Sequence, residues 1–293
     1  MKSLAIAVAF AFAAGPALAI DFGRILDAGR QAVQSAQGSP ASKEFSQEDE
    51  VALGNALTAS FLGASPLHPD AGLQRYVNRV GKWIALHSDR PELPWTFSVI
   101  ETDTINAFAM PGGSIIVSSG LVKRLNSEAE LAGVLAHEIA HVVKKHQLSA
   151  IQSAMKADFW KGVGTSVAAD RVRIGGGVVG STVGSIAKPY ILDAAGNLIK
   201  DGFFLKPLDR GMESEADQHA IVLVVRSGYD AYGLVGALQM LAQYKGEPDG
   251  ASLLSTHPSA ADRIADLEKF MPSVESYAKS PQLLEARFKQ NVK

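Results

Sequence analysis

The stretch Ala136-His137-Glu138-Ile139-Ala140-His141 decides how the rest of this chain is interpreted. The residues before it, Ser127-Glu128-Ala129-Glu130, have the pattern of a capping box, which predicts that a helix starts there and runs through the stretch. Side chains four positions apart lie on one face of a helix, so His137 and His141 can both bind one zinc ion. Glu138 lies beside them, where it can take a proton from a zinc-bound water.

Acidic residues further along the chain are candidates for a third ligand. The segment Glu213-Ser214-Glu215-Ala216-Asp217 precedes an apolar helical stretch, and Glu213 and Asp217 share one face of that helix. One of them can bind the metal while the other accepts a hydrogen bond from a ligand histidine. Glu215 is a rival ligand, but its position in the helix predicts that it faces away. Two histidines, one carboxylate and an open position for water form a zinc site of the catalytic kind.

The composition limits which residues can bind a metal and which classes of protein the chain can belong to. The chain has 293 residues and no cysteine, so a metal must be held by His, Asp and Glu. Hydrophobic residues make up 47% and charged residues 20%, which excludes a disordered chain and a protein with several membrane spans. The net charge of -2 offers no basic footprint, so we expect no nucleic-acid partner.

The N-terminus is typical of a secretory signal peptide. Lys2 precedes the apolar stretch 4–14, and Gly15-Pro16 then precedes the small residues Ala17-Leu18-Ala19. We expect cleavage after Ala19 and a periplasmic protein, the alternative being an uncleaved N-terminal anchor. The expected organisation is a signal peptide (1–19), a helix and linker (20–45), a metal-binding domain (46–272) and a C-terminal tail (273–293).

Periodicity predicts a mostly helical α+β domain. Apolar residues at helical spacing predict helices over 46–62 and 73–86, and alternation predicts a strand over 95–100. Residues 107–110 and 114–117 flank Pro111-Gly112-Gly113 and predict a β-hairpin. The short sheet is expected beside the helix that carries His137 and His141.

The segment 162–202 is rich in glycine, with Gly176, Gly180 and Gly184 repeating every four residues in an uncharged stretch. In the sequence it lies between residues 136–141 and residues 213–217, so one interpretation is that it covers the substrate cleft at the metal site. A buried helix hairpin is the equal alternative.

Four features of the chain together resemble the zinc metallopeptidases related to HtpX and the CAAX prenyl proteases, within the gluzincins. They are the residues 136–141, the residues 213–217, the hairpin 106–113, and Thr256-His257-Pro258 followed by Arg263. The likeness extends over about residues 45 to 270 and is strongest to the soluble, exported members of the periplasm. It implies a zincin-type domain that binds one Zn²⁺ through His137, His141 and Glu213. Glu138 would be the general base, and Asp217 would accept a hydrogen bond from one of the ligand histidines.

The resemblance implies an exported zinc endopeptidase that cleaves unfolded or extended polypeptides in envelope quality control. The hairpin residues Ala107, Phe108, Ala109 and Met110 would then bind the substrate as an added strand. A contact with a membrane surface or with outer-membrane assembly stays open, as does the oligomeric state. The alternative function is a chaperone-like or latent binding module in which zinc is structural.

The remaining candidates have two interpretations each. His257 is either an oxyanion donor or removable fourth ligand, or a turn residue. Arg263 either clamps substrate or pairs with an acidic residue such as Asp217, and the structural pairing is favoured. His146 follows Lys144-Lys145 at the expected end of the helix and is predicted to lie on the surface.

Overall fold

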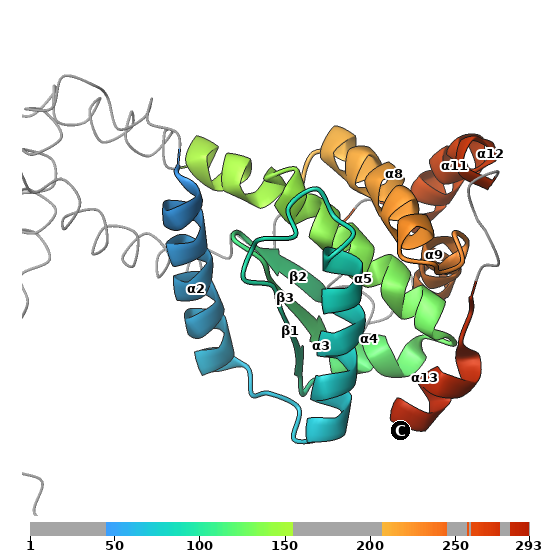
Figure 1. The fold of residues 1–293 in the computed structure, drawn as a ribbon, viewed down its shortest axis with the longest axis horizontal. Helices are drawn as coiled ribbons and strands as arrows, with labels where there is room; N and C mark the ends of the chain where they lie inside the picture. The colour runs from blue at the N-terminus through green and yellow to red at the C-terminus, as the bar shows by residue number, and fades with distance from the viewer. Residues whose placement is uncertain (1–44, 155–206, 245–256, 258, 276–281, 293) are drawn as a thin grey trace, which may run out of the picture. The chain divides into compact units, whose positions relative to one another are not determined.

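Helix α5 (Glu128–Val143) lies between a three-stranded sheet and a group of C-terminal helices in the computed structural model (Figure 1). The structure describes residues 45–154, 207–244, 257, 259–275 and 282–292. The predicted signal peptide, the helix expected within residues 20–45 and the glycine-rich segment lie outside the described residues. The predicted class, mostly helical α+β, is confirmed.

The sheet contains β1 (Thr96–Ile100), β2 (Ala107–Met110) and β3 (Ser114–Ser118) in the order β1-β3-β2. The predicted hairpin is present, with Ala107 opposite Val117 in an antiparallel β2–β3 pair. Its turn uses Gly112 and Gly113 at φ values of 77° and 107°, which glycine adopts without steric cost. Strand β1 runs parallel to β3.

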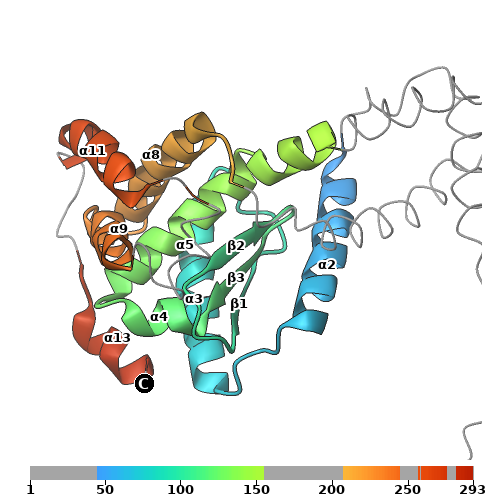
Figure 2. The same cartoon turned by 180° about the vertical axis from the view of Figure 1, so that it is seen from behind.

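Alternate strand residues pack against different helices. Phe108, Met110 and Ile116 pack with α2 (Gln47–Ala64), whereas their neighbours Ala107, Ala109 and others belong to the larger core around α5. This alternation follows from the period of two in a strand. The sheet is therefore covered by α2 on one face and by α3 (Ala71–Ala85) and α5 on the other, as Figure 2 shows from behind.

Helix starts follow local capping chemistry. Ser46 and Asp49 form a reciprocal capping box at the start of α2, and the Asp70 side chain caps α3. A short helix, α4 (Ser119–Arg124), follows β3 directly. At α5 the Ser127 hydroxyl accepts from Glu130 N, as predicted, but the Glu130 carboxylate accepts from Asn126 N instead of Ser127 N.

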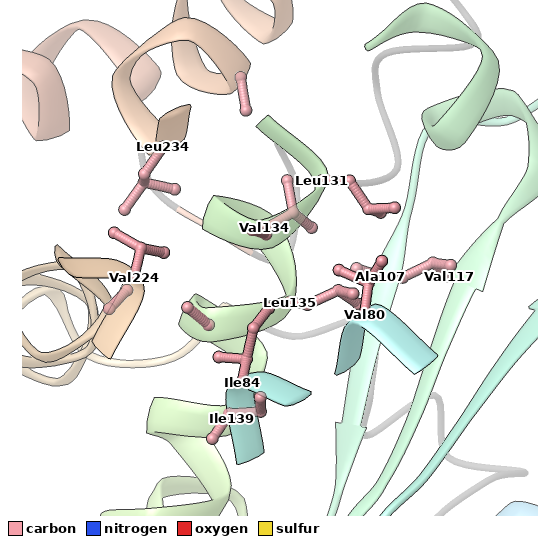
Figure 3. Close-up of a cluster of buried hydrophobic side chains, with 14 of the residues drawn as sticks. Val80, Ile84, Ala107, Val117, Leu131, Val134, Leu135, Ile139, Val224 and Leu234 are labelled. Atoms are coloured by element: carbon pink, nitrogen blue, oxygen red, sulfur yellow. The ribbon is translucent and has the colours of Figure 1, made fainter. Parts of the chain in front are cut away.

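The far side of α5 is covered by α8 (Arg210–Arg226) and α9 (Gly233–Gln243). Figure 3 shows the apolar side chains of α5, among them Leu135 and Ile139, packed between α3 and the sheet on one side and Val224 and Leu234 on the other. Gly133 in α5 lies so close to Leu234 N that a Cβ atom there would come within 2.5 Å of it. This crossing brings α8 and α9 onto the helix that carries His137 and His141.

The C-terminal residues add α11 (Ala260–Phe270), α12 (Pro272–Glu275) and α13 (Glu285–Asn291) to the same compact unit, residues 44–293. Helix α13 lies beyond residue 272, where we expected the domain to end, and contacts α3 and α5. Its Arg287 donates two hydrogen bonds to the buried carboxylate of Glu128, which also accepts from the Tyr76 and Tyr229 hydroxyls. Among the described residues, no helix is both long enough and apolar enough to cross a bilayer.

Candidate metal centre

Four buried side chains converge on one point: His137 and His141 from α5, Glu213 from the first turn of α8, and His257. Their potential ligand atoms all lie within 4.8 Å of one another. His137 Nε2 and His141 Nε2 are 3.0 Å apart, because residues four positions apart stack on one face of α5. Glu213 completes the group, with its carboxylate oxygens 3.5 Å from His137 Nε2 and 3.4 Å from His141 Nε2.

This donor set fits a zinc ion. Ligand atoms about 2.0–2.1 Å from a tetrahedral zinc lie about 3.3 Å apart, close to the spacings of this group. Burial lowers the pKa of His141 well below its usual range, so its imidazole stays neutral, as a ligand must be. Burial alone would raise the pKa of Glu213, but His257 and His137 outweigh it and hold that carboxyl ionised. The residues present thus fit the predicted Zn²⁺ site. His137 differs from His141 in charge: burial and Arg263 lower its pKa, but Asp217 and Glu213 outweigh them and raise it to about 9, so zinc binding there would release a proton.

Glu138 is buried beside these ligands, and no described residue donates a hydrogen bond to its carboxylate. That carboxylate lies 3.9 Å from His257 Nε2. Burial raises the pKa of the Glu138 carboxyl. A carboxylate with few donors and a raised pKa is suited to accept and release a proton.

Asp217 and Arg263 lie directly behind His137. The Asp217 carboxylate is 2.9 Å from His137 Nδ1, the arrangement that fixes the orientation of a metal-binding imidazole. Arg263, from α11, binds both oxygens of Asp217 at 2.8 and 2.6 Å. Burial alone would raise the pKa of Asp217, but the Arg263 guanidinium outweighs it and lowers the pKa to about 2. Arg263 thus makes the pairing with Asp217 that the sequence favoured.

His257 lies against Glu213. Its Nδ1 is 2.9 and 2.8 Å from the two carboxylate oxygens. The ring therefore either holds Glu213 in place or turns a nitrogen toward the metal, and it is not a residue of an exposed turn.

The prediction that His146 lies on the surface is wrong. His146 is buried, and its Nδ1 is 2.9 Å from Nδ1 of His141. The helix does not continue through this region, because Lys145 has φ 58° and redirects the chain. Glu215 faces away from the ligands, as expected, but its carboxylate is 3.3 Å from His146 Nε2 and 3.0 Å from Lys144 Nζ.

The four hairpin residues proposed to bind substrate are all buried. Phe108 packs against Phe61, with ring centroids 4.7 Å apart, and Met110 lies in the same core cluster. The side chains of Phe108 and Met110 therefore support the fold. His219, on the ligand-bearing helix α8, lies 3.7 Å from Asp89 and makes no contact with the ligand group.

Comparison with known proteins identifies the family. Residues 71–271 match the model of peptidase family M48. The chain is 30% identical over 234 residues to the beta-barrel assembly-enhancing proteases of Yersinia pestis and Escherichia coli, an alignment that covers 78% of this chain and 45% of theirs. It is 32% identical over 204 residues to the mitochondrial metalloendopeptidase OMA1 of Schizosaccharomyces pombe, covering 68% of this chain and 53% of that one. The chain thus spans about half the length of the curated relatives it matches.

The match over the metal centre confirms the resemblance found in the sequence, and the chain belongs to peptidase family M48, a family of zinc metallopeptidases.

Proposed function

We propose that this protein is an exported zinc endopeptidase that hydrolyses peptide bonds in unfolded or extended polypeptides. The observation that carries the proposal is the position of Glu138, buried next to the ligand His137 and without a hydrogen bond among the described residues. A zinc site with a purely structural role has no use for such a group.

Each residue of the site has a proposed part in the reaction. Bound zinc would polarise the scissile carbonyl and lower the pKa of the attacking water. Glu138 accepts a proton from that water and delivers it to the leaving amine. Asp217 holds His137 through Nδ1, and Arg263 keeps Asp217 ionised and in place.

The outer edge of β2 supports binding of an extended chain. Ser118 N donates to Asn106 O, so residues 106, 108 and 110 face β3 and the backbone groups of Ala107 and Ala109 face outward. Ala107 N donates to the Asn106 side chain, whereas the outward-facing Ala109 N has no acceptor in the part of the chain that the structure describes. Helix α5 contacts β2, so a peptide added along this edge would run beside the metal centre.

This binding mode can be tested at two positions of β2. Ala109→Pro deletes the outward donor, so KM for an unstructured peptide should rise several-fold. Ala107→Pro deletes the N–H that Asn106 already binds, and it is the matched control with an unchanged KM. Equal KM values in the two variants would contradict recognition by strand addition.

The cellular role is also a proposal. The bacterial relatives are named for enhancing the assembly of β-barrels, and the N-terminal residues 1–19 have the pattern of a signal peptide. We therefore propose that this protein is exported to the periplasm with cleavage after Ala19, and that it removes unfolded envelope proteins there.

Glu138→Gln tests the proposed activity. It should lower the rate of unfolded-casein cleavage by about 10²–10⁴, the usual contribution of a general base, and leave zinc content unchanged. Glu268→Gln makes the same chemical change at an exposed position of α11 and should cleave at the unsubstituted rate. Cleavage by Glu138→Gln at that rate would show that the mechanism is wrong.

One observation favours the chaperone-like or latent alternative. With His257 the group contains four protein donors, and four protein ligands close a zinc site to water. If zinc is structural, the unsubstituted protein and Glu138→Gln should both suppress casein aggregation and neither should cleave it.

His257→Ala separates a gate from a catalytic group. If His257 closes the site, its removal should raise the cleavage rate of one unstructured peptide. If it stabilises the oxyanion, removal should lower turnover by about 10²–10³. An unchanged rate would exclude both roles.

A further inference from the structure

The proposed peptidase activity does not use one buried histidine at the metal centre. His146 lies behind His141, on the opposite side from the metal, and the resemblance in sequence assigns it no role. We propose that His146 is a positioning residue that fixes the His141 imidazole for zinc by accepting its Nδ1 hydrogen. This inference concerns the zinc site on which the proposed function rests.

The two sides of the His141 ring have different partners. Nε2 faces His137 and Glu213, so it is the nitrogen that would bind zinc. A neutral imidazole that binds a metal through Nε2 carries its proton on Nδ1 and needs an acceptor there. The atom 2.9 Å from His141 Nδ1 is His146 Nδ1, which is therefore the unprotonated nitrogen of its ring.

The rest of the network agrees with this assignment. With Nδ1 free, His146 carries its proton on Nε2, and that atom lies 3.3 Å from the Glu215 carboxylate. The opposite tautomer would place two N–H groups against each other at 2.9 Å and leave Glu215 without this donor. One arrangement of protons therefore satisfies both hydrogen bonds: His141 donates to His146, and His146 donates to Glu215.

The backbone is bent in a way that makes this contact possible. On a continuous helix, a residue five positions after His141 would point roughly 140° away from it around the axis. Helix α5 ends at Val143, Lys145 adopts φ 58°, and residues 146–154 start a new helical segment. A lysine in the left-handed region costs about 1–2 kcal/mol, so surrounding structure must hold the bend in place.

That structure is the second core cluster. Leu148 and Ile151, from the segment after the bend, are buried in the cluster that includes Leu53 and Leu57 of α2. The burial of Leu148 and Ile151 therefore holds the segment after the bend in place, and with it the backbone position of His146.

The two ligand histidines are consequently held by different chemistry. His137 donates to a carboxylate, Asp217, which is itself bound by Arg263. His141 donates to a neutral imidazole. The Glu215 behind it is half-exposed and contributes less, because solvent screens its charge.

The test measures zinc affinity of the purified full chain by competition with a chromogenic chelator. His146→Leu keeps the bulk but removes the acceptor, so it should weaken zinc binding about 10–100-fold. His146→Asn puts an amide oxygen close to the position of Nδ1 and should restore most of the affinity. His219→Leu is the matched control, because it removes a half-buried histidine of α8 whose Nε2 makes no hydrogen bond to any described residue.

Two results would overturn the proposal: His146→Leu that binds zinc as tightly as the unsubstituted chain, or His146→Asn that loses as much affinity as His146→Leu. Nitrogen-15 NMR of the unsubstituted, zinc-loaded protein decides the question even if a variant fails to fold. The His146 ring should carry its proton on Nε2, and a proton on Nδ1 would contradict the assignment. Zinc affinity is read without proteolysis, so a failure of Glu138→Gln to abolish cleavage would leave this result standing.

Discussion

Helix α5 buries two glutamates, and the two have opposite surroundings. Near its start, Glu128 is fully buried and accepts from the Tyr76 hydroxyl at 2.8 Å, from the Tyr229 hydroxyl at 2.7 Å and from Arg287. In the ligand-bearing half, Glu138 is 2% exposed and, among the described residues, accepts no hydrogen bond. Burying a carboxylate is costly unless donors replace the lost water.

The difference shows how one residue type serves two purposes on one helix. Donors surround Glu128, so its charge is used to hold α3, α5 and the C-terminal helix α13 together. No described residue donates to Glu138, so its lone pairs are available for a proton from water. The number of donors around each carboxylate thus separates a residue that stabilises the fold from one suited to chemistry.

The largest expected effect on stability is that of Glu128→Gln. It weakens the hydrogen bonds from Tyr76, Tyr229 and Arg287 to a charged acceptor. It should therefore lower the free energy of unfolding by about 2–4 kcal/mol, measured by urea denaturation with excess zinc. Glu138→Gln is the matched control on the same helix. It should not lower stability, because it removes a carboxylate that has no donors. A greater loss in Glu138→Gln than in Glu128→Gln would contradict the comparison.

Arg287→Leu should cost about 1–2 kcal/mol in the same assay. Its two hydrogen bonds go to a buried carboxylate, but its own side chain is half-exposed, so the loss is smaller than for Glu128. Lys289→Leu, in the same helix, loses only an exposed pair with Glu285 and should change stability by less than about 0.5 kcal/mol. Equal effects of the two substitutions would mean that α13 is not held through Glu128.

Alkaline pH tests the Glu128 site through its tyrosines. Burial, followed by the hydrogen bond to Glu128, raises the pKa of Tyr76 and of Tyr229 above the usual range. These phenols stabilise the fold fully below the unfolded-state pKa of about 10, and that contribution is lost as pH rises through the folded-state pKa. At pH 10.5 each phenol should cost about 0.8 kcal/mol relative to pH 8. The Tyr76→Phe/Tyr229→Phe variant should lack this part of the decline, and an identical decline in both proteins would refute it.

The smallest expected effect lies at the other end of α5. Lys145→Gly should stabilise the protein by about 0.5 kcal/mol, because the relief of a left-handed lysine exceeds the added entropy of glycine in the unfolded chain. Lys145→Val, with a branched Cβ at the same φ, should destabilise it. A loss of stability in Lys145→Gly would mean that the lysine side chain, 4.0 Å from Glu50, contributes more than the backbone strain costs.

Local rules were enough to predict much of this molecule. The four-residue spacing of His137 and His141, and of Glu213 and Asp217, fixes which side chains share a helical face, and these pairs meet in the structure. The hairpin followed from Pro111-Gly112-Gly113 between two apolar runs.

Two features could not be predicted in this way. His146 was misplaced because lysine rarely adopts a positive φ, so nothing in Lys144-Lys145 signals a bend that depends on the burial of Leu148 and Ile151. The contact between Glu128 and Arg287 joins residues 159 positions apart, beyond the reach of any local pattern.

The donors at the metal centre come from distant parts of the chain: α5, the start of α8, and the single residue His257. In an unfolded chain these groups are far apart, and joining them closes two long loops at an entropic cost. A metal that binds only the assembled site therefore acts as a reversible cross-link, and it stabilises the folded chain by an amount that rises with the logarithm of its free concentration above Kd. The supply of zinc would then control the fraction of this protein that is folded, in addition to its activity.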